Sequence, residues 1–168
     1  MSPDERCNRL AVLLDQYGSA LALFATQWTD SPDDCVQEAL IRLAGQVSWP
    51  VNDVAWLYRV VKNEAISQSR ASYRRRWREQ FAARLRPELS EAESSIDREI
   101  LAGALESLES SLREILIAKV WGRLTLEQIA DAFGLSKSSA HRRYEQALAA
   151  LRKQLGVPCK TTRNATHS

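Results

Sequence analysis

The amino-acid sequence predicts an all-α protein with two small helical domains joined by a linker. Strong helix formers such as Ala, Leu, Arg, Glu and Gln dominate the 168 residues, whereas only six residues are Gly and five are Pro. Apolar residues recur every three or four positions over long stretches, as they do on one face of an α-helix. No segment alternates apolar and polar residues with β-branched enrichment, so we expect no strands.

Three helices are expected in the N-terminal half. The first spans about residues 3–27 and carries regularly spaced leucines and aromatic residues. The second begins after Ser31, where Asp34 completes a pattern similar to a capping box. Its apolar stripe follows the spacing i, i+4, i+7 and i+11 and consists of Val36, Leu40, Leu43 and Val47. The third begins near Asn52 and runs toward the arginine-rich stretch 70–78.

A linker is expected where the periodicity fades and the sequence becomes acidic, although Phe81 and Leu85 leave a continuation of the third helix open. The chain then divides into an N-terminal domain (1–78), a linker (79–95), a C-terminal domain (96–155) and a flexible tail (156–168). The C-terminal domain is expected to hold helices over about 96–108, 110–121, 125–132 and 136–155.

The last two of these helices have the layout of a helix-turn-helix. Thr125 with Gln128 forms a capping box for a short first helix. Gly134 suits a left-handed turn because it lacks a Cβ, and Ser136 can cap the second helix. At about 100° per residue, Arg142 falls opposite the apolar side of that second helix. The second helix therefore has one side for packing and one for contact with a partner.

The outward surface of the second helix carries hydrogen-bond donors and positive charge. It consists of Lys137, Ser138, Ser139, His141, Arg142, Arg143 and Gln146. Arginine, hydroxyl and amide groups read base edges in the major groove, while Lys and Arg hold phosphates. A solvated basic face on an ordinary helical hairpin is the alternative. The short capped first helix and the Gly-Leu-Ser turn favour DNA binding.

Composition excludes several other functions. Cys7, Cys35 and Cys159 are far apart and odd in number, which argues against a disulfide framework and a zinc site. We find no nucleophile motif, metal-ligand cluster or Gly-rich phosphate loop, and therefore expect no enzyme, metal or cofactor. The longest apolar run, residues 20–25, is too short to span a bilayer. We therefore expect a soluble cytoplasmic protein with no membrane insertion.

Together these motifs resemble the extracytoplasmic-function sigma factors, small members of the sigma-70 superfamily of RNA polymerase sigma factors. The segments "DDCVQEALIRL" and "WLYRVVKNEAISQSR" are similar to the family's domain for polymerase binding and −10 recognition. The segment "LESSLREILIAKVWGRLTLEQIADAFGLSKSSAHRRYEQALAALRKQL" is similar to the domain for −35 recognition. Departures such as Ser67, Ser110 and Gln146 affect base preferences more than the fold.

The resemblance assigns two further surfaces. A face of the second helix would bind the β′ clamp of the polymerase through Asp34, Gln37, Glu38, Ile41 and Arg42. The third helix, with the loop before it, would bind the −10 strand through Trp49, Asn52, Arg59, Lys62, Asn63, Arg70, Arg74, Arg75 and Arg76. Trp49 can stack on an unpaired base or simply pack against the protein.

The implied function is that of a promoter-specificity subunit. The partners implied are core RNA polymerase, through its β′ clamp and β flap, and promoter DNA. Whether an anti-sigma factor is also a partner is left open. One alternative is a stand-alone helix-turn-helix transcriptional regulator, which would lack a polymerase-binding face. Another is a helical adaptor or decoy that has lost DNA binding, against which the basic surface from Lys137 to Arg143 argues.

Overall fold

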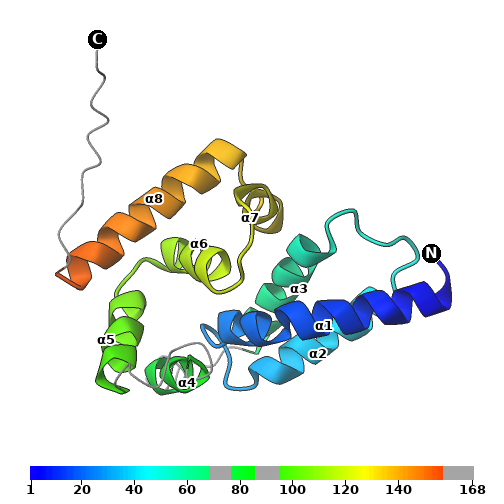
Figure 1. Ribbon diagram of the computed structural model, residues 1–168, viewed down its shortest axis with the longest axis horizontal. Coiled ribbons are helices and arrows are strands. Elements are labelled where there is room, and N and C mark those ends of the chain that lie inside the picture. Colours follow the sequence, from blue (N-terminus) through cyan, green and yellow to red (C-terminus); the bar gives the residue numbers. More distant parts are fainter. Residues whose placement is uncertain (69–76, 86–94, 157–168) are drawn as a thin grey trace, which may run out of the picture.

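The computed structural model describes residues 1–68, 77–85 and 95–156, apart from the side chains of 95–97. Within these ranges the chain forms eight α-helices and no strand, which confirms the predicted all-α fold (Figure 1). The helices are α1 (Pro3–Ala25), α2 (Pro32–Ala44), α3 (Asp53–Ser67), α4 (Trp77–Arg84), α5 (Ser95–Glu106), α6 (Ser110–Val120), α7 (Leu126–Phe133) and α8 (Lys137–Gln154). None of these helices is long and apolar enough to cross a bilayer.

Helices α1, α2 and α3 pack against one another around an aromatic core. Phe24 is fully buried, and its ring lies edge-on to Tyr58 at 5.0 Å and to Trp28 at 5.2 Å between centroids. Leu43 and Leu57 are also fully buried and bring α2 and α3 onto this centre. Burying such side chains is the main stabilising contribution to a small helical bundle.

Two predictions for α2 are wrong in detail. The Ser31 side chain makes no capping hydrogen bond, and its backbone N–H instead donates to Thr29 Oγ1 at 3.1 Å. Val47 does not extend the apolar stripe, because the helix ends at Ala44 and Val47 is 97% exposed in the following loop. The apolar stripe of α2 therefore ends with the helix at Ala44, and the following loop begins earlier than the sequence predicts.

Helix α4 occupies part of the predicted linker. Phe81 and Leu85 are fully buried, and the Trp77 and Phe81 rings stack with centroids 5.1 Å apart. Phe81 also meets Trp121 edge-on at 5.7 Å, which joins α4 to the C-terminal helices. The prediction of a linker is thus wrong for residues 79–85, since this segment supplies core side chains. The rest of that prediction, residues 86–94, lies outside the described residues.

The helix-turn-helix forms as the sequence predicts. Thr125 and Gln128 exchange both hydrogen bonds of a capping box at the start of α7. Gly134 ends that helix in the left-handed region with φ of 66°, and Ser136 Oγ accepts from the Ser139 N–H to cap α8. The angle between α7 and α8 is therefore fixed by local signals at the turn.

The N-terminal and C-terminal helices share one interface, in which α3 lies against α7 and α1 against α6 (Figure 1). The rings of Phe24 and Phe133 lie 5.8 Å apart across it. A Cβ on Gly122 would overlap the Tyr58 hydroxyl and the Ala118 carbonyl oxygen, so this approach requires glycine. The buried side chains form one continuous cluster through both groups of helices. The division into two domains stays a prediction, and here the two groups are closed on each other.

Candidate nucleic-acid and polymerase interfaces

Helix α8 presents most of its predicted DNA-contacting side chains to solvent. Ala140 and Ala147 are fully buried on the opposite side, against α6 and α7. Lys137, Ser138, His141, Arg142 and Gln146 are exposed, and Ser139 and Arg143 are half-buried. The two serines lie within 3.2 Å of the Ser136 hydroxyl at the helix start. The structure thus exposes five of the seven residues predicted from the sequence, and all seven lie within the first ten residues of α8.

Lys137 has an acidic neighbour on the preceding helix. Its Nζ lies 2.7 Å from Glu127 Oε1, and both side chains are more than 60% exposed. The bond from Lys137 holds the pKa of the Glu127 carboxyl below its usual value. Such an exposed pair contributes little to stability, and a phosphate can compete for this lysine.

The two basic residues expected on the DNA-binding side of α3 are engaged by the C-terminal helices instead. Arg59 Nη2 donates to the Asp131 backbone oxygen at 2.5 Å and lies 3.2 Å from Asp131 Oδ1. Lys62 Nζ lies 2.6 Å from Glu114 Oε2. Asn63 is exposed. The face of α3 that the sequence assigns to DNA is therefore largely an intramolecular contact with α6 and α7.

The Lys62–Glu114 pair is the more buried of the two. The Glu114 side chain is 9% exposed and that of Lys62 is 28% exposed. The Lys62 ammonium also lies 5.9 Å from the Trp28 ring centroid and 5.4 Å from that of Phe133. A cation between two aromatic rings and a buried carboxylate is held from three sides.

Among the remaining residues predicted for −10 binding, Arg70 and Arg74–Arg76 lie outside the described residues.

The loop before α3 is ordered by polar contacts of its own. Trp49 is half-buried and packs against the core, and its indole N–H donates to Asp53 Oδ2 at 3.2 Å. Asn52 Oδ1 accepts from the Ala55 N–H at 3.1 Å and caps α3. In this state Trp49 therefore packs against the protein, and Asn52 caps the N-terminus of α3.

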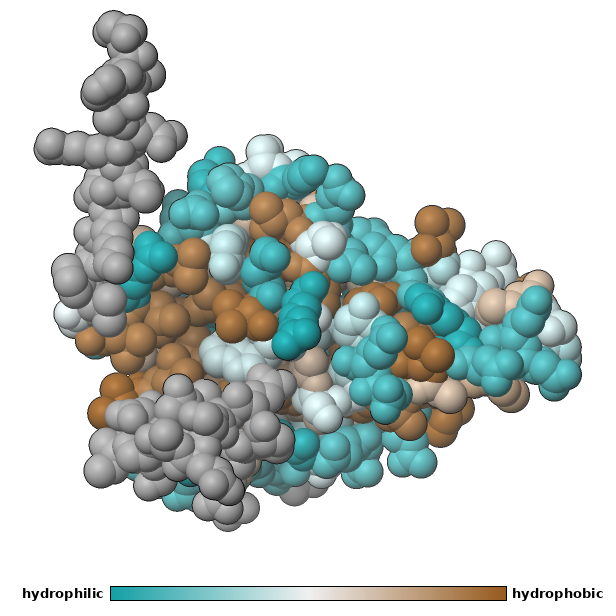
Figure 2. All heavy atoms as spheres, viewed as in Figure 1, coloured by the Kyte–Doolittle hydropathy of each residue, from teal (hydrophilic) through white to brown (hydrophobic). Residues whose placement is uncertain are grey.

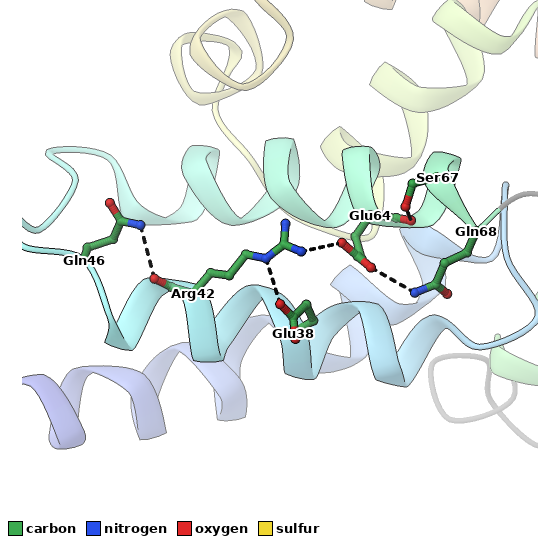
Figure 3. Close-up of polar contacts among 6 residues, drawn as sticks. All are labelled: Glu38, Arg42, Gln46, Glu64, Ser67 and Gln68. Carbon is green, nitrogen blue, oxygen red and sulfur yellow. Dashed lines mark hydrogen bonds and ion pairs between the residues drawn. The ribbon is translucent and has the colours of Figure 1, made fainter.

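Two of the side chains predicted to bind polymerase belong to a polar network between α2 and α3 (Figure 3). Arg42 bridges Glu38 on its own helix and Glu64 on α3, each at 2.8 Å. Glu64 Oε1 also accepts from Gln68 Nε2 at 3.0 Å. Because the Arg42–Glu64 pair joins α2 to α3, replacing Arg42 would also disturb the contact between these helices. The other three residues of the set, Asp34, Gln37 and Ile41, are exposed, and Ile41 is 59% exposed.

Comparison with known proteins assigns the C-terminal helices to a known domain family. The family described as sigma-70, region 4 matches residues 104–153, which include all of α6, α7 and most of α8. A probable RNA polymerase sigma factor, RfaY of Xanthomonas campestris pv. campestris, is 30% identical over 149 residues. Residues 104–153 therefore belong to the sigma-70 region 4 family. This confirms the resemblance noted in the sequence.

Two similar proteins each match most of this chain. The alignment with RfaY covers 82% of this chain and 37% of RfaY, so the chain spans just over a third of that protein's length. The solved structure of CnrH, in complex with the cytosolic domain of CnrY, covers 88% of this chain and 87% of the CnrH chain. Its TM-score of 0.59 at 21% identity shows a shared fold.

Sequence reasoning missed the acidic partners of two basic residues on α3, Arg59 and Lys62. Glu114 lies in the middle of α6 and Asp131 near the end of α7, more than 50 positions from the residues they pair with. The local signal was Glu114 itself, a carboxylate directly before the apolar residues Ile115–Ala118 of α6. A charged side chain that is buried next to such a run needs a partner, which another element can supply.

Proposed function

We propose that the chain is an RNA polymerase sigma factor of the extracytoplasmic-function type, which directs core polymerase to promoters through −35 and −10 recognition and is not an enzyme. The observation that carries the proposal is the exposed face of α8, where Arg142, Ser138 and Gln146 stand opposite the buried Ala140 and Ala147 within a sigma-70 region 4 domain. A cytoplasmic location goes with this proposal.

Recognition of the −35 element by α8 follows from side-chain chemistry. The arginine guanidinium can donate two parallel hydrogen bonds to the major-groove edge of guanine. The serine hydroxyls and the amide nitrogens at the N-terminus of the helix suit phosphate or base contacts. Arg142 lies one turn into the helix and fully on its outward side, which makes it the side chain best placed to reach a base edge.

Recognition of the −10 strand uses α3 and the loop before it. In the state described here, Arg59 and Lys62 are paired with Asp131 and Glu114. These pairs must open before the two basic side chains can bind phosphates. The proposed function therefore includes a change in which α3 separates from α6 and α7.

Binding to polymerase uses the exposed side of α2. Ile41 stands 59% exposed beside Asp34 and Gln37, opposite the buried Val36 and Leu43. An apolar side chain amid acidic and polar groups suits a basic partner surface with an apolar centre, and the β′ clamp is the partner we propose for it. The β flap is proposed as a second contact of the C-terminal domain. An anti-sigma factor is proposed as a further partner, because the similar chain CnrH was solved with the cytosolic domain of CnrY.

Run-off transcription tests the proposal directly. Purified chain is added to core polymerase on a library of promoter fragments, and start sites are mapped. Transcripts that depend on the chain, with shared −35 and −10 sequences upstream, support a sigma factor. DNA binding in a gel-shift assay without stimulation of core polymerase indicates a stand-alone regulator. Absence of both activities indicates an adaptor.

A further inference from the structure

The loop between α2 and α3, residues 45–52, is attached to α1 at its entry. Arg6 Nη1 donates to the Gln46 backbone oxygen at 2.8 Å, and Arg6 Nη2 donates to the Val47 backbone oxygen at 3.2 Å. Both acceptors belong to the first residues after α2 and its end at Gly45. One guanidinium therefore fixes two consecutive peptide groups of the loop.

A second arginine of α1 fixes the exit of the same loop. Arg9 Nε and Nη2 donate to Asp53 Oδ2 and Oδ1 at 2.7 and 3.0 Å, a bidentate pair. Asp53 is the first residue of α3 and only 7% exposed. Burial alone would raise the pKa of its carboxyl, but the hydrogen bonds from Arg9 and Trp49 outweigh burial and hold that pKa below its usual value. The carboxylate thus joins α1, α3 and the loop tryptophan.

Two valine side chains of this loop are exposed. Val47 is 97% exposed and Val51 is 108% exposed, the highest values among the large apolar residues described. Apolar surface projects where this loop lies, at the right of the molecule (Figure 2). Valine gains nothing from such exposure, so a loop that is held firmly in this shape indicates a surface prepared for contact.

We propose that Arg6 and Arg9 are positioning residues for −10 recognition, which hold the loop 45–52 in the shape that receives an unstacked base. This inference rests on the proposed function, because the loop's role in −10 binding is part of it. The arginines themselves touch the loop and Asp53 rather than the nucleic acid. Their contribution is preorganisation, since a loop already fixed loses less conformational freedom on binding.

The test uses the full chain with core polymerase and fork-junction promoter DNA. Single-base variants of each −10 position give the base preference, and 2-aminopurine at the same positions reports unstacking through its fluorescence. Arg9→Gln is expected to reduce discrimination at the unstacked position about tenfold and to lower the 2-aminopurine signal. Preference in the −35 element and affinity for core polymerase are expected to stay unchanged.

Two further variants separate geometry from charge. Arg9→Lys keeps the positive charge but cannot form the bidentate pair, so discrimination is expected to recover only in part. Arg6→Gln removes bonds to the backbone at the exposed edge of the loop, and it keeps the test valid if Arg9→Gln does not fold. Arg152→Gln, an exposed arginine at the far end of α8, is the charge-matched control and should behave as the unaltered chain.

A double-mutant cycle locates the effect. If Arg9 acts through Asp53, then Arg9→Gln combined with Asp53→Asn should lose no more discrimination than the more damaging single variant. Unchanged base preference and fluorescence in both Arg9→Gln and Arg6→Gln overturn the inference. An equal loss of output on every −10 sequence, with weaker polymerase binding, also overturns it. If the unaltered chain shows no −10 preference at all, the proposed function fails rather than this inference alone.

Discussion

Replacing Glu114 by glutamine is expected to open the contact between α3 and the C-terminal helices. Glutamine has the same shape and can still accept a hydrogen bond, but the ion pair with Lys62 is lost. The change lies on α6, which supplies none of the residues proposed to bind DNA. An increase in −10 strand binding would therefore come from release of α3 and not from a new contact.

The structure sets the size of the expected effect. At an effective dielectric constant of about 20, two unit charges about 4 Å apart attract by roughly 4 kcal/mol, and desolvation of the carboxylate offsets part of this. Breaking a fully buried pair costs about 3–5 kcal/mol. The Lys62 side chain is 28% exposed and can turn to water, so we expect about 1–2 kcal/mol. That corresponds to a roughly 5- to 30-fold shift of the closed–open equilibrium.

Fluorescence anisotropy with a single-stranded −10 oligonucleotide at fixed salt measures this shift. If only the open form binds, the apparent affinity of Glu114→Gln rises by up to the same factor, while the melting temperature falls. Glu99→Gln removes an equal charge from an exposed position on α5 and serves as the control. Asp131→Asn should have a smaller effect, since the Arg59–Asp131 pair is about half exposed. A lower melting temperature with unchanged or weaker oligonucleotide binding would refute the reasoning.

Three further outcomes are expected. Ile41→Glu should weaken binding to core polymerase in a pull-down while circular dichroism stays unchanged, because the side chain is exposed and outside the Arg42 network. Arg142→Ala should relax base preference in the −35 element by about 1–3 kcal/mol in run-off transcription, whereas an equal loss on all sequences would make it a phosphate contact. In a Cys159→Ser chain, the exposed Cys7 should react quickly with iodoacetamide and the buried Cys35 slowly. Burial, together with nearby carboxylates, raises the pKa of the Cys35 thiol to about 11, and only the thiolate reacts.

The parts of the fold that the sequence predicted best are those set by local signals. The capping box of Thr125 and Gln128, the left-handed Gly134 and the Ser136 cap all lie within a few residues of the helix ends they define. Such signals act through hydrogen bonds between near neighbours in the chain. The exposed face of α8 then followed from helical periodicity alone, since the neighbouring helices cover only one side of it.

The linker prediction failed where a weak local signal had strong tertiary support. Trp77, Phe81 and Leu85 follow the spacing i, i+4 and i+8, which is a helical stripe, but the segment is short and rich in charge. Three large side chains buried against α5 and Trp121 stabilise this helix. An isolated helix of this length is marginal in water, so its stability comes from contacts that periodicity cannot reveal.

In the candidate sites, too, the sequence could not reveal the partners of charged side chains, because those partners come from distant parts of the chain. The resemblance assigned Arg59 and Lys62 to the −10 strand, a partner that carries negative phosphate groups. Carboxylate and phosphate offer these groups the same chemistry, namely negative oxygen acceptors at hydrogen-bonding distance. Which one is bound depends on the arrangement of α3 against α6 and α7, and that arrangement brings Glu114 within 2.6 Å. One basic surface can thus serve an internal contact in the closed chain and DNA in the open one. A carboxylate partner then limits when DNA can bind, because each pair must break before a phosphate replaces it.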